Sequence, residues 1–188
     1  MGEPDSRGEI AHRFSPAAPE EQYVYGSCSP GWHSAANHET CLDQWIGFME
    51  SQGIERVCCL LAGRHLADER ANLDKYETAF GSPNVLHEPV PDEQLVGVEH
   101  LDGEILPFVE ESVETGRPVV VHGLAGVGRT GQVLAAWLIY SRGYEPSAAV
   151  ETVREAGRDP TAAVDAGNAT RSELFAVLGT LAERGRTD

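Results

Sequence analysis

A glycine-rich segment between a strand-like run and a helix-like run holds the residues of this chain best suited to chemistry. It reads HGLAGVGRTG over residues 122–131 and follows the β-branched run of residues 119–121. Glycines let successive backbone N–H groups converge on one point, and a following helix adds the positive end of its dipole. Arg129 adds a planar guanidinium that matches two oxygens of a phosphate. Together these features predict a binding loop for a doubly charged oxyanion.

One interpretation of this loop is the P-loop of a nucleotide-binding protein. Residues 123–130 read Gly-x-x-x-x-Gly-Arg-Thr, which differs from the Walker A pattern only in having Arg129 where lysine is needed. Arginine is not an equal substitute, because lysine reaches the phosphates as a compact charge. The sequence also offers no apolar strand that ends in an aspartate able to hold magnesium. A P-loop nucleotide binder is therefore the remote alternative.

The same loop resembles the signature of the cysteine-dependent protein tyrosine and dual-specificity phosphatases, His-Cys-x-x-Gly-x-x-Arg-Ser/Thr-Gly. The residues in register with that signature are His122, Gly126, Arg129, Thr130 and Gly131. The resemblance covers about residues 22–183 and is strongest over residues 84–142. It implies that the arginine binds phosphate, that the threonine hydrogen-bonds the nucleophile and that the histidine orients the loop. It also implies a substrate-binding segment made of His122, Leu124, Ala125, Gly126, Val127, Gly128 and Arg129.

Gly123 is the departure from the signature, because it stands where the family has its nucleophilic cysteine. In the family the thiolate forms a phosphocysteine intermediate, and glycine has no side chain to replace it. Cys58 and Cys59 lie within an apolar run and are expected to be buried strand residues rather than substitutes. The glycine is either a natural feature of a pseudophosphatase or an introduced change that traps substrate. In both cases the chain is expected to bind phosphate without hydrolysing it.

Asp92 is the candidate general acid. The family places an aspartate on a loop some thirty residues before the cysteine, where it protonates the leaving oxygen. Asp92 precedes Gly123 by 31 positions and lies in the proline-rich run of residues 89–94. An ordinary turn aspartate is the alternative reading, and Glu93 is the less favoured candidate for the same role.

Charge and composition limit the class of ligand. The formal net charge is −16, with 30 acidic and 14 basic side chains, and Lys75 is the only lysine. This balance resembles that of haloarchaeal or other salt-adapted proteins, with an ordinary acidic protein as the alternative. It also opposes nucleic-acid binding, which needs a basic footprint. No signal peptide or membrane-spanning run is recognisable, so a cytoplasmic location is expected. The expected ligands are a phosphorylated protein, a small phosphomonoester, or a phosphate or sulfate ion, with no cofactor and no metal.

Strand-like and helix-like runs alternate along the chain and predict an α/β domain with a short, mostly parallel central sheet between helices. We expect a loose tail over residues 1–21 and one phosphatase-like domain over residues 22–188. The expected strands lie at 22–26, 56–61, 84–88 and 118–121. The expected helices lie near 42–49, 71–80, 98–113, 128–142, 147–156 and 172–182. Arg64, after the second strand, is a minor candidate for contact with an acidic substrate.

Two function classes therefore remain. The first is a phosphatase scaffold that lacks only its nucleophile, and the second is a signalling module that binds phosphorylated ligands and has no catalytic role. Restoring a cysteine at position 123 separates them, since only the first class would then turn over substrate.

Overall fold

The computed structural model describes residues 10–185 except residues 33, 35, 64 and 66–70. Its centre is a five-stranded sheet with the order β1-β2-β5-β3-β4. The strands are β1 (Ser15–Pro16), β2 (Val24–Ser27), β3 (Arg56–Cys59), β4 (Val85–His87) and β5 (Val119–His122). All neighbouring pairs are parallel except β1 and β2, which are antiparallel. The expected α/β fold with a mostly parallel sheet is therefore confirmed, with one antiparallel strand at the edge.

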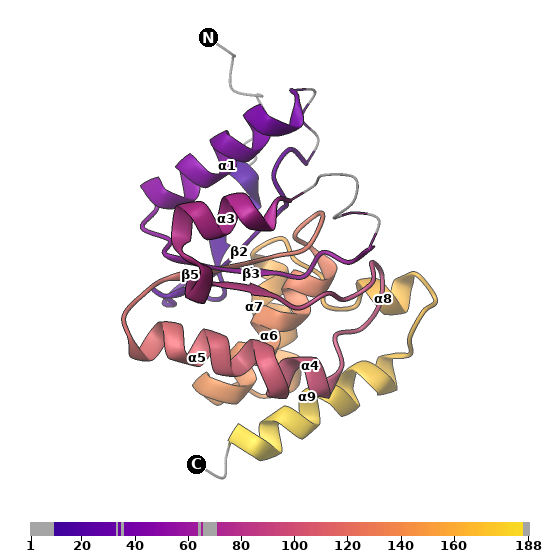
Figure 1. The fold of residues 1–188 in the computed structure, drawn as a ribbon. Helices are drawn as coiled ribbons and strands as arrows, with labels where there is room; N and C mark the ends of the chain where they lie inside the picture. The colour runs from indigo at the N-terminus through magenta and orange to yellow at the C-terminus, as the bar shows by residue number, and fades with distance from the viewer. Residues whose placement is uncertain (1–9, 33, 35, 64, 66–70, 186–188) are drawn as a thin grey trace.

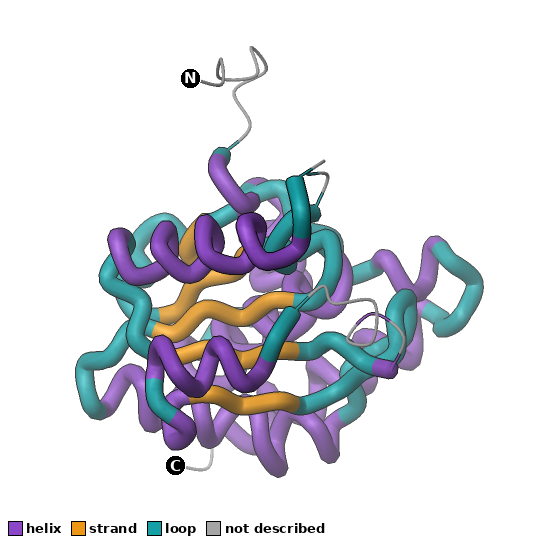
Figure 2. Tube along the Cα trace, turned by 45° about the horizontal axis from the view of Figure 1, so that its top comes forward, coloured by secondary structure: helices purple, strands orange, loops and turns teal. Residues whose placement is uncertain are grey.

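Helices cover both faces of the sheet (Figure 1). One face carries α1 (His38–Ser51) and α3 (Leu73–Phe80), which pack over the strands (Figure 2). The other face carries α4 (Val98–His100), the π-helical turn η3 (Leu101–Ile105), α5 (Leu106–Glu114), α6 (Gly128–Arg142), α7 (Pro146–Glu155) and α9 (Arg171–Gly185). The short helix α8 (Ala162–Asp165) lies beside the start of α6, and the 3-10 turns η1 (Ala11–Arg13) and η2 (Ser82–Asn84) precede β1 and β4.

The central strands feed two separate hydrophobic cores. Cys58 packs into the core on the α6 side, whereas the adjacent Cys59 packs with Trp45 and Tyr76 on the α1 side. Successive side chains of a strand point to opposite faces, so a strand buried on both faces needs an unbroken apolar run. This explains why β3 and β5 lack polar alternation, and it places both cysteines in the interior as expected.

The N-terminal region differs from the expected loose tail. Residues 1–9 lie outside the described residues, but residues 10–21 form η1 and β1. The side chains of Ala17 and Glu21 are buried, and Glu21 accepts hydrogen bonds from Trp137 Nε1 and Arg142 Nε, each at 3.1 Å. Prolines and small residues obscured this packing in the sequence, because a two-residue edge strand leaves no periodic pattern.

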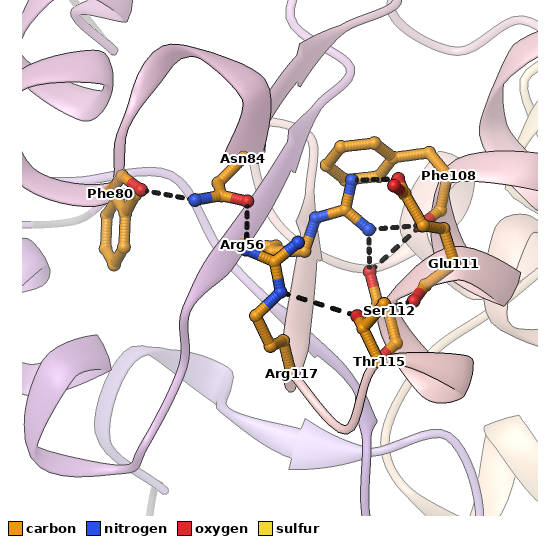
Figure 3. Close-up of polar contacts among 8 residues, drawn as sticks. All are labelled: Arg56, Phe80, Asn84, Phe108, Glu111, Ser112, Thr115 and Arg117. Carbon is orange, nitrogen blue, oxygen red and sulfur yellow. Dashed lines mark hydrogen bonds and ion pairs between the residues drawn. The ribbon is translucent and has the colours of Figure 1, made fainter.

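A buried arginine supports the sheet at the end opposite the glycine-rich loop. Arg56, at the start of β3, donates to the carbonyl of Phe108 at 2.8 Å and to Ser112 Oγ at 2.7 Å, and it pairs with Glu111 at 2.7 Å (Figure 3). Its guanidinium lies 3.8 Å from the centre of the Phe108 ring. Most of its donors therefore have partners from α5, which ties that helix to β3.

Candidate anion-binding site

The loop between β5 and α6 turns its carbonyl groups outward. Every carbonyl of residues 123–127 accepts a hydrogen bond from outside the loop or from the first turn of α6. The donors, in order, are His122 Nδ1 (2.8 Å), Ser29 N (2.9 Å), Arg13 Nη1 (3.0 Å), Arg158 Nη1, and the backbone N–H groups of Gly131 and Asp159 (3.1 Å each). In a trans peptide the N–H points opposite to the carbonyl, so these bonds direct the following N–H groups inward.

The inward N–H groups are available to a ligand. In the described part of the chain, no backbone or side-chain acceptor takes the N–H groups of residues 124–130. They surround a pocket of about 260 Å³ that also reaches Trp32, Asp92 and Ala162. Converging backbone donors at the start of a fifteen-residue helix make a binding place for an anion.

Two glycines of the loop, Gly126 and Gly123, differ in whether the backbone requires a residue without a side chain. Gly126 has φ +74°, and a Cβ there would lie 2.4 Å from the carbonyl oxygen of Ser27, so this position requires glycine. Gly123 has no left-handed φ, and the atoms nearest to a Cβ there would be those of the Arg129 guanidinium, at 3.4 Å, the lower limit of ordinary contact. The backbone would therefore accept a side chain at position 123, and cysteine is compatible with this loop.

Arg129 and Asp92 meet at the pocket. Arg129 Nη2 lies 2.9 Å from Asp92 Oδ1, and its Nη1 donates to the carbonyl of Val90 at 2.7 Å. The Arg129 side chain is 4% exposed, whereas that of Asp92 is 39% exposed. Burial is the main influence on Arg129 and lowers its pKa from the ordinary value, with Asp92 opposing the shift. The carboxylate of Asp92 therefore occupies one guanidinium donor of Arg129.

Two further side chains, those of Gln132 and Asn168, form hydrogen bonds to the loop that carries Asp92. The Gln132 amide forms two hydrogen bonds with the backbone N–H and carbonyl of Val96, each 2.8 Å long. Asn168 Nδ2 donates to the carbonyl of Glu93 at 3.0 Å. Sequence reasoning did not identify Gln132. The sequence signal that could have pointed to this residue is its position directly after the signature.

Thr130 sits beneath Gly123. Its Oγ1 accepts the Gly123 N–H at 3.0 Å, and the residue is almost fully buried. Because the oxygen is the acceptor in this bond, the hydroxyl proton remains free to donate towards an atom placed at residue 123. The structure thus brings Gly123, Arg129, Thr130 and Asp92 together at one pocket. Arg64 lies outside the described residues.

His122 is held in one neutral tautomer behind the loop. Its Nδ1 faces the carbonyl of Gly123, which can only accept, so Nδ1 carries the proton and Nε2 accepts from the Tyr76 hydroxyl at 3.0 Å. The Trp45 ring packs against both residues, with centroid distances of 5.1 Å to Tyr76 and 5.2 Å to His122. Complete burial lowers the pKa of His122 to about 4.

This depressed pKa predicts a loss of stability in mild acid. The unfolded chain protonates its histidine near the ordinary pKa of 6.5, whereas folded His122 resists protonation down to about 4. The stabilisation from neutral His122 is therefore complete above pH 6.5 and is lost as the pH falls towards 4. Integrated over that interval, it amounts to about 3 kcal/mol. Urea unfolding measured at several pH values, with an NMR titration of His122, tests this expectation, and a His122 titration near 6.5 would contradict it.

The cysteines of β3 are poorly suited to act as nucleophiles. Cys58 and Cys59 are fully buried. Burial raises the pKa of Cys58 well above its ordinary value, and it raises that of Cys59 to about 12. A thiol with such a pKa is protonated near neutral pH and is a weak nucleophile.

Comparison with known families agrees with this geometry. The family model for Tc-R-P, described as "Polymorphic toxin system, DSP-PTPase phosphatase", matches residues 32–143, which is more than half of the chain. Dual-specificity protein phosphatases of monkeypox and variola viruses are 28% identical over 67 residues, covering 36% of this chain. The match spans only 39% of the length of those viral relatives.

Solved structures extend the similarity over most of the chain. Tk-PTP, in a glycine-to-alanine mutant form, is 32% identical with a TM-score of 0.65, and the match covers 90% of this chain and 95% of that one. TpbA of P. aeruginosa, in a cysteine-to-serine form in complex with phosphotyrosine, is 18% identical with a TM-score of 0.58. That match covers 88% of this chain and 87% of TpbA, and at this identity it shows the fold alone.

Proposed function

The chain belongs to the Tc-R-P family of DSP-PTPase phosphatases, and from this premise we propose that it binds a phosphomonoester dianion and does not hydrolyse it. The observation that carries the proposal is Gly123 within an otherwise complete anion cradle. The loop N–H groups and Arg129 depend on backbone geometry and on α6, so they do not need a thiolate. Because a thiolate would also repel a dianion, its absence favours tighter binding.

The absence of turnover follows from the missing covalent step. In the family reaction, a thiolate displaces the leaving group and forms phosphocysteine, which water then hydrolyses. Glycine cannot form this bond, and the raised pKa values of the buried β3 cysteines keep them from replacing it. Asp92 could still protonate a leaving oxygen, but without an attacking group the phosphorus–oxygen bond is not broken.

The proposed ligand is a phosphorylated protein or a small phosphomonoester, with a phosphate or sulfate ion able to occupy the same loop. The pocket wall supports this class, since Trp32 and Ala162 give it an apolar side beside the loop amides. The structure of a TpbA form with serine in place of cysteine, in complex with phosphotyrosine, is a precedent for such binding in this fold. The net charge of −16 disfavours nucleic acids as partners.

The second candidate function is a signalling module that binds phosphorylated ligands and has no catalytic role. The retained contact between Asp92 and Arg129 favours the first candidate, because a module that only binds has no need of a general acid. A nucleotide-binding P-loop is disfavoured by the buried, Asp92-paired arginine that stands where a lysine would reach outward.

The cellular setting is also a proposal. The acidic, lysine-poor composition supports a salt-adapted, haloarchaeal origin. The four cysteines are free thiols, which supports a reducing, cytoplasmic location. No helix within the described ranges is long and apolar enough to cross a membrane.

Calorimetry with inorganic phosphate and an assay with p-nitrophenyl phosphate test the proposed function together. We expect saturable binding of phosphate, with a Kd of about 1 mM or tighter, and no release of p-nitrophenol above the rate in buffer. The proposal fails if the purified chain cleaves the ester and Asp92→Asn abolishes that activity. It also fails if no phosphate binds.

A further inference from the structure

Arg158 is a buried cation directly behind the anion cradle. It follows α7, is 3% exposed and donates through Nη1 to the carbonyl of Gly126. Its Nη2 donates to the carbonyl of Arg13 at 2.8 Å and to Ser15 Oγ at 2.9 Å. A Cβ added at Gly26 would lie 2.7 Å from the Arg158 guanidinium carbon. The glycine of β2 therefore leaves room for this arginine beneath the loop.

The charge of Arg158 has no carboxylate partner among the described residues, since its two Nη atoms donate to two carbonyls and one hydroxyl and its buried Nε makes no hydrogen bond. The other fully buried arginine outside the pocket, Arg56, is paired with Glu111 at 2.7 Å (Figure 3). Burial lowers the pKa of Arg158 to about 10, so the group stays charged at neutral pH. Burying a charge without a counterion destabilises the folded state. We therefore expect Arg158 to have a function that offsets this cost.

Arg13 reinforces the same part of the loop. Its Nη1 donates to the carbonyl of Ala125 at 3.0 Å, and its own carbonyl accepts from Arg158. The backbone of Arg13 has φ 50°, a left-handed conformation that non-glycine residues rarely adopt. The chain thus turns unusually at this residue and presents its side chain and its carbonyl to the loop and to Arg158. Two adjacent loop carbonyls are each held outward by a guanidinium.

We propose that Arg158 and Arg13 are positioning residues of the anion cradle. In this proposal the bound dianion provides the negative charge that Arg158 lacks within the fold. By holding the carbonyls of residues 125 and 126 outward, they direct the N–H groups of residues 126 and 127 towards the ligand. Their positive charge, one peptide plane behind those groups, adds to the field at the pocket. The inference rests on the proposed anion binding and adds two residues to it.

Paired substitutions separate charge from packing. Arg158→Lys and Arg158→Gln both shorten the side chain and lose the guanidinium fork, but only lysine keeps the charge. At constant ionic strength we expect Arg158→Lys to bind inorganic phosphate within ~3-fold of the unchanged chain and Arg158→Gln to bind it ~10-fold more weakly. Both variants should lose similar thermal stability without phosphate. A purely structural role would instead give the two variants equal affinities, which would overturn the inference.

Arg13 and Arg56 complete the test. Arg13 is partly exposed, so Arg13→Lys and Arg13→Gln provide the same comparison if the Arg158 variants do not fold, with an expected difference of ~3-fold. Arg56→Gln should lower the melting temperature and leave the phosphate Kd unchanged, because Arg56 lies at the opposite end of the sheet. Equal affinities in the Arg13 pair would likewise overturn the inference. Failure of the unchanged chain to bind phosphate would overturn the proposed function first.

Discussion

Gly123→Cys is expected to turn this chain into an active phosphatase, with p-nitrophenyl phosphate hydrolysis at least ~10³-fold above that of the unchanged chain. The backbone at residue 123 accepts a side chain, since it has no left-handed φ and the atoms nearest to a Cβ would be those of the Arg129 guanidinium, at 3.4 Å. The loop N–H groups, the start of α6 and Arg129 would all lower the pKa of the new thiol, so that it is a thiolate at neutral pH.

Gly123→Ser is the matched control for this substitution. It fills nearly the same space and adds a hydroxyl, which stays protonated, so we expect phosphate binding without turnover. Arg129→Ala in the Gly123→Cys background should destroy the activity by removing the guanidinium that stabilises the transferring phosphoryl group. If Gly123→Cys binds phosphate and remains inactive, the scaffold is a binding module rather than an enzyme that lacks one side chain.

Asp92→Asn is expected to have opposite effects in two backgrounds. In the unchanged chain, the Asp92 carboxylate lies 2.9 Å from Arg129 Nη2 and competes with an incoming dianion. Its removal should tighten phosphate binding by ~10-fold, measured by calorimetry. In the Gly123→Cys background the same change removes the proton donor for the leaving group. There, kcat for an alkyl phosphate should fall by ~10²-fold or more.

Glu93→Gln is the matched control on the same loop. Glu93 also lines the pocket, but no ion pair between its carboxylate and Arg129 is present in the structure. We therefore expect Glu93→Gln to leave kcat within a few-fold of that of Gly123→Cys alone. If Glu93→Gln abolishes turnover and Asp92→Asn does not, the general acid is Glu93.

The sequence predicted the parts of this fold that leave a periodic or glycine-rich pattern. The buried strands β3 and β5, the loop after β5 and the helix that begins at Gly128 all follow from unbroken apolar runs and from helical spacing. The spacing to Gly123 singled out Asp92, but the ion pair of Asp92 with Arg129 is a contact that the sequence did not predict.

The supports of the site could not be predicted in the same way. Arg13, Gln132 and Arg158 act through hydrogen bonds to backbone atoms, and such bonds impose no sequence pattern on their partners. Arg13 lies in a region that the sequence predicted to be a loose tail. Its contacts are with residues more than one hundred positions away, and such contacts leave no local pattern in the sequence. Only the three-dimensional structure shows that Arg13 and Arg158 contact the loop after β5 and that Gln132 contacts the loop that carries Asp92.

Phosphorus NMR of the unchanged chain mixed with phosphotyrosine tests the central claim most directly, because one sample reports both binding and hydrolysis. We predict that the ester resonance shifts or broadens in a saturable manner and that no inorganic phosphate accumulates over many hours. The appearance of inorganic phosphate at a rate that Asp92→Asn abolishes would contradict the account, as would an ester resonance unaffected by the protein.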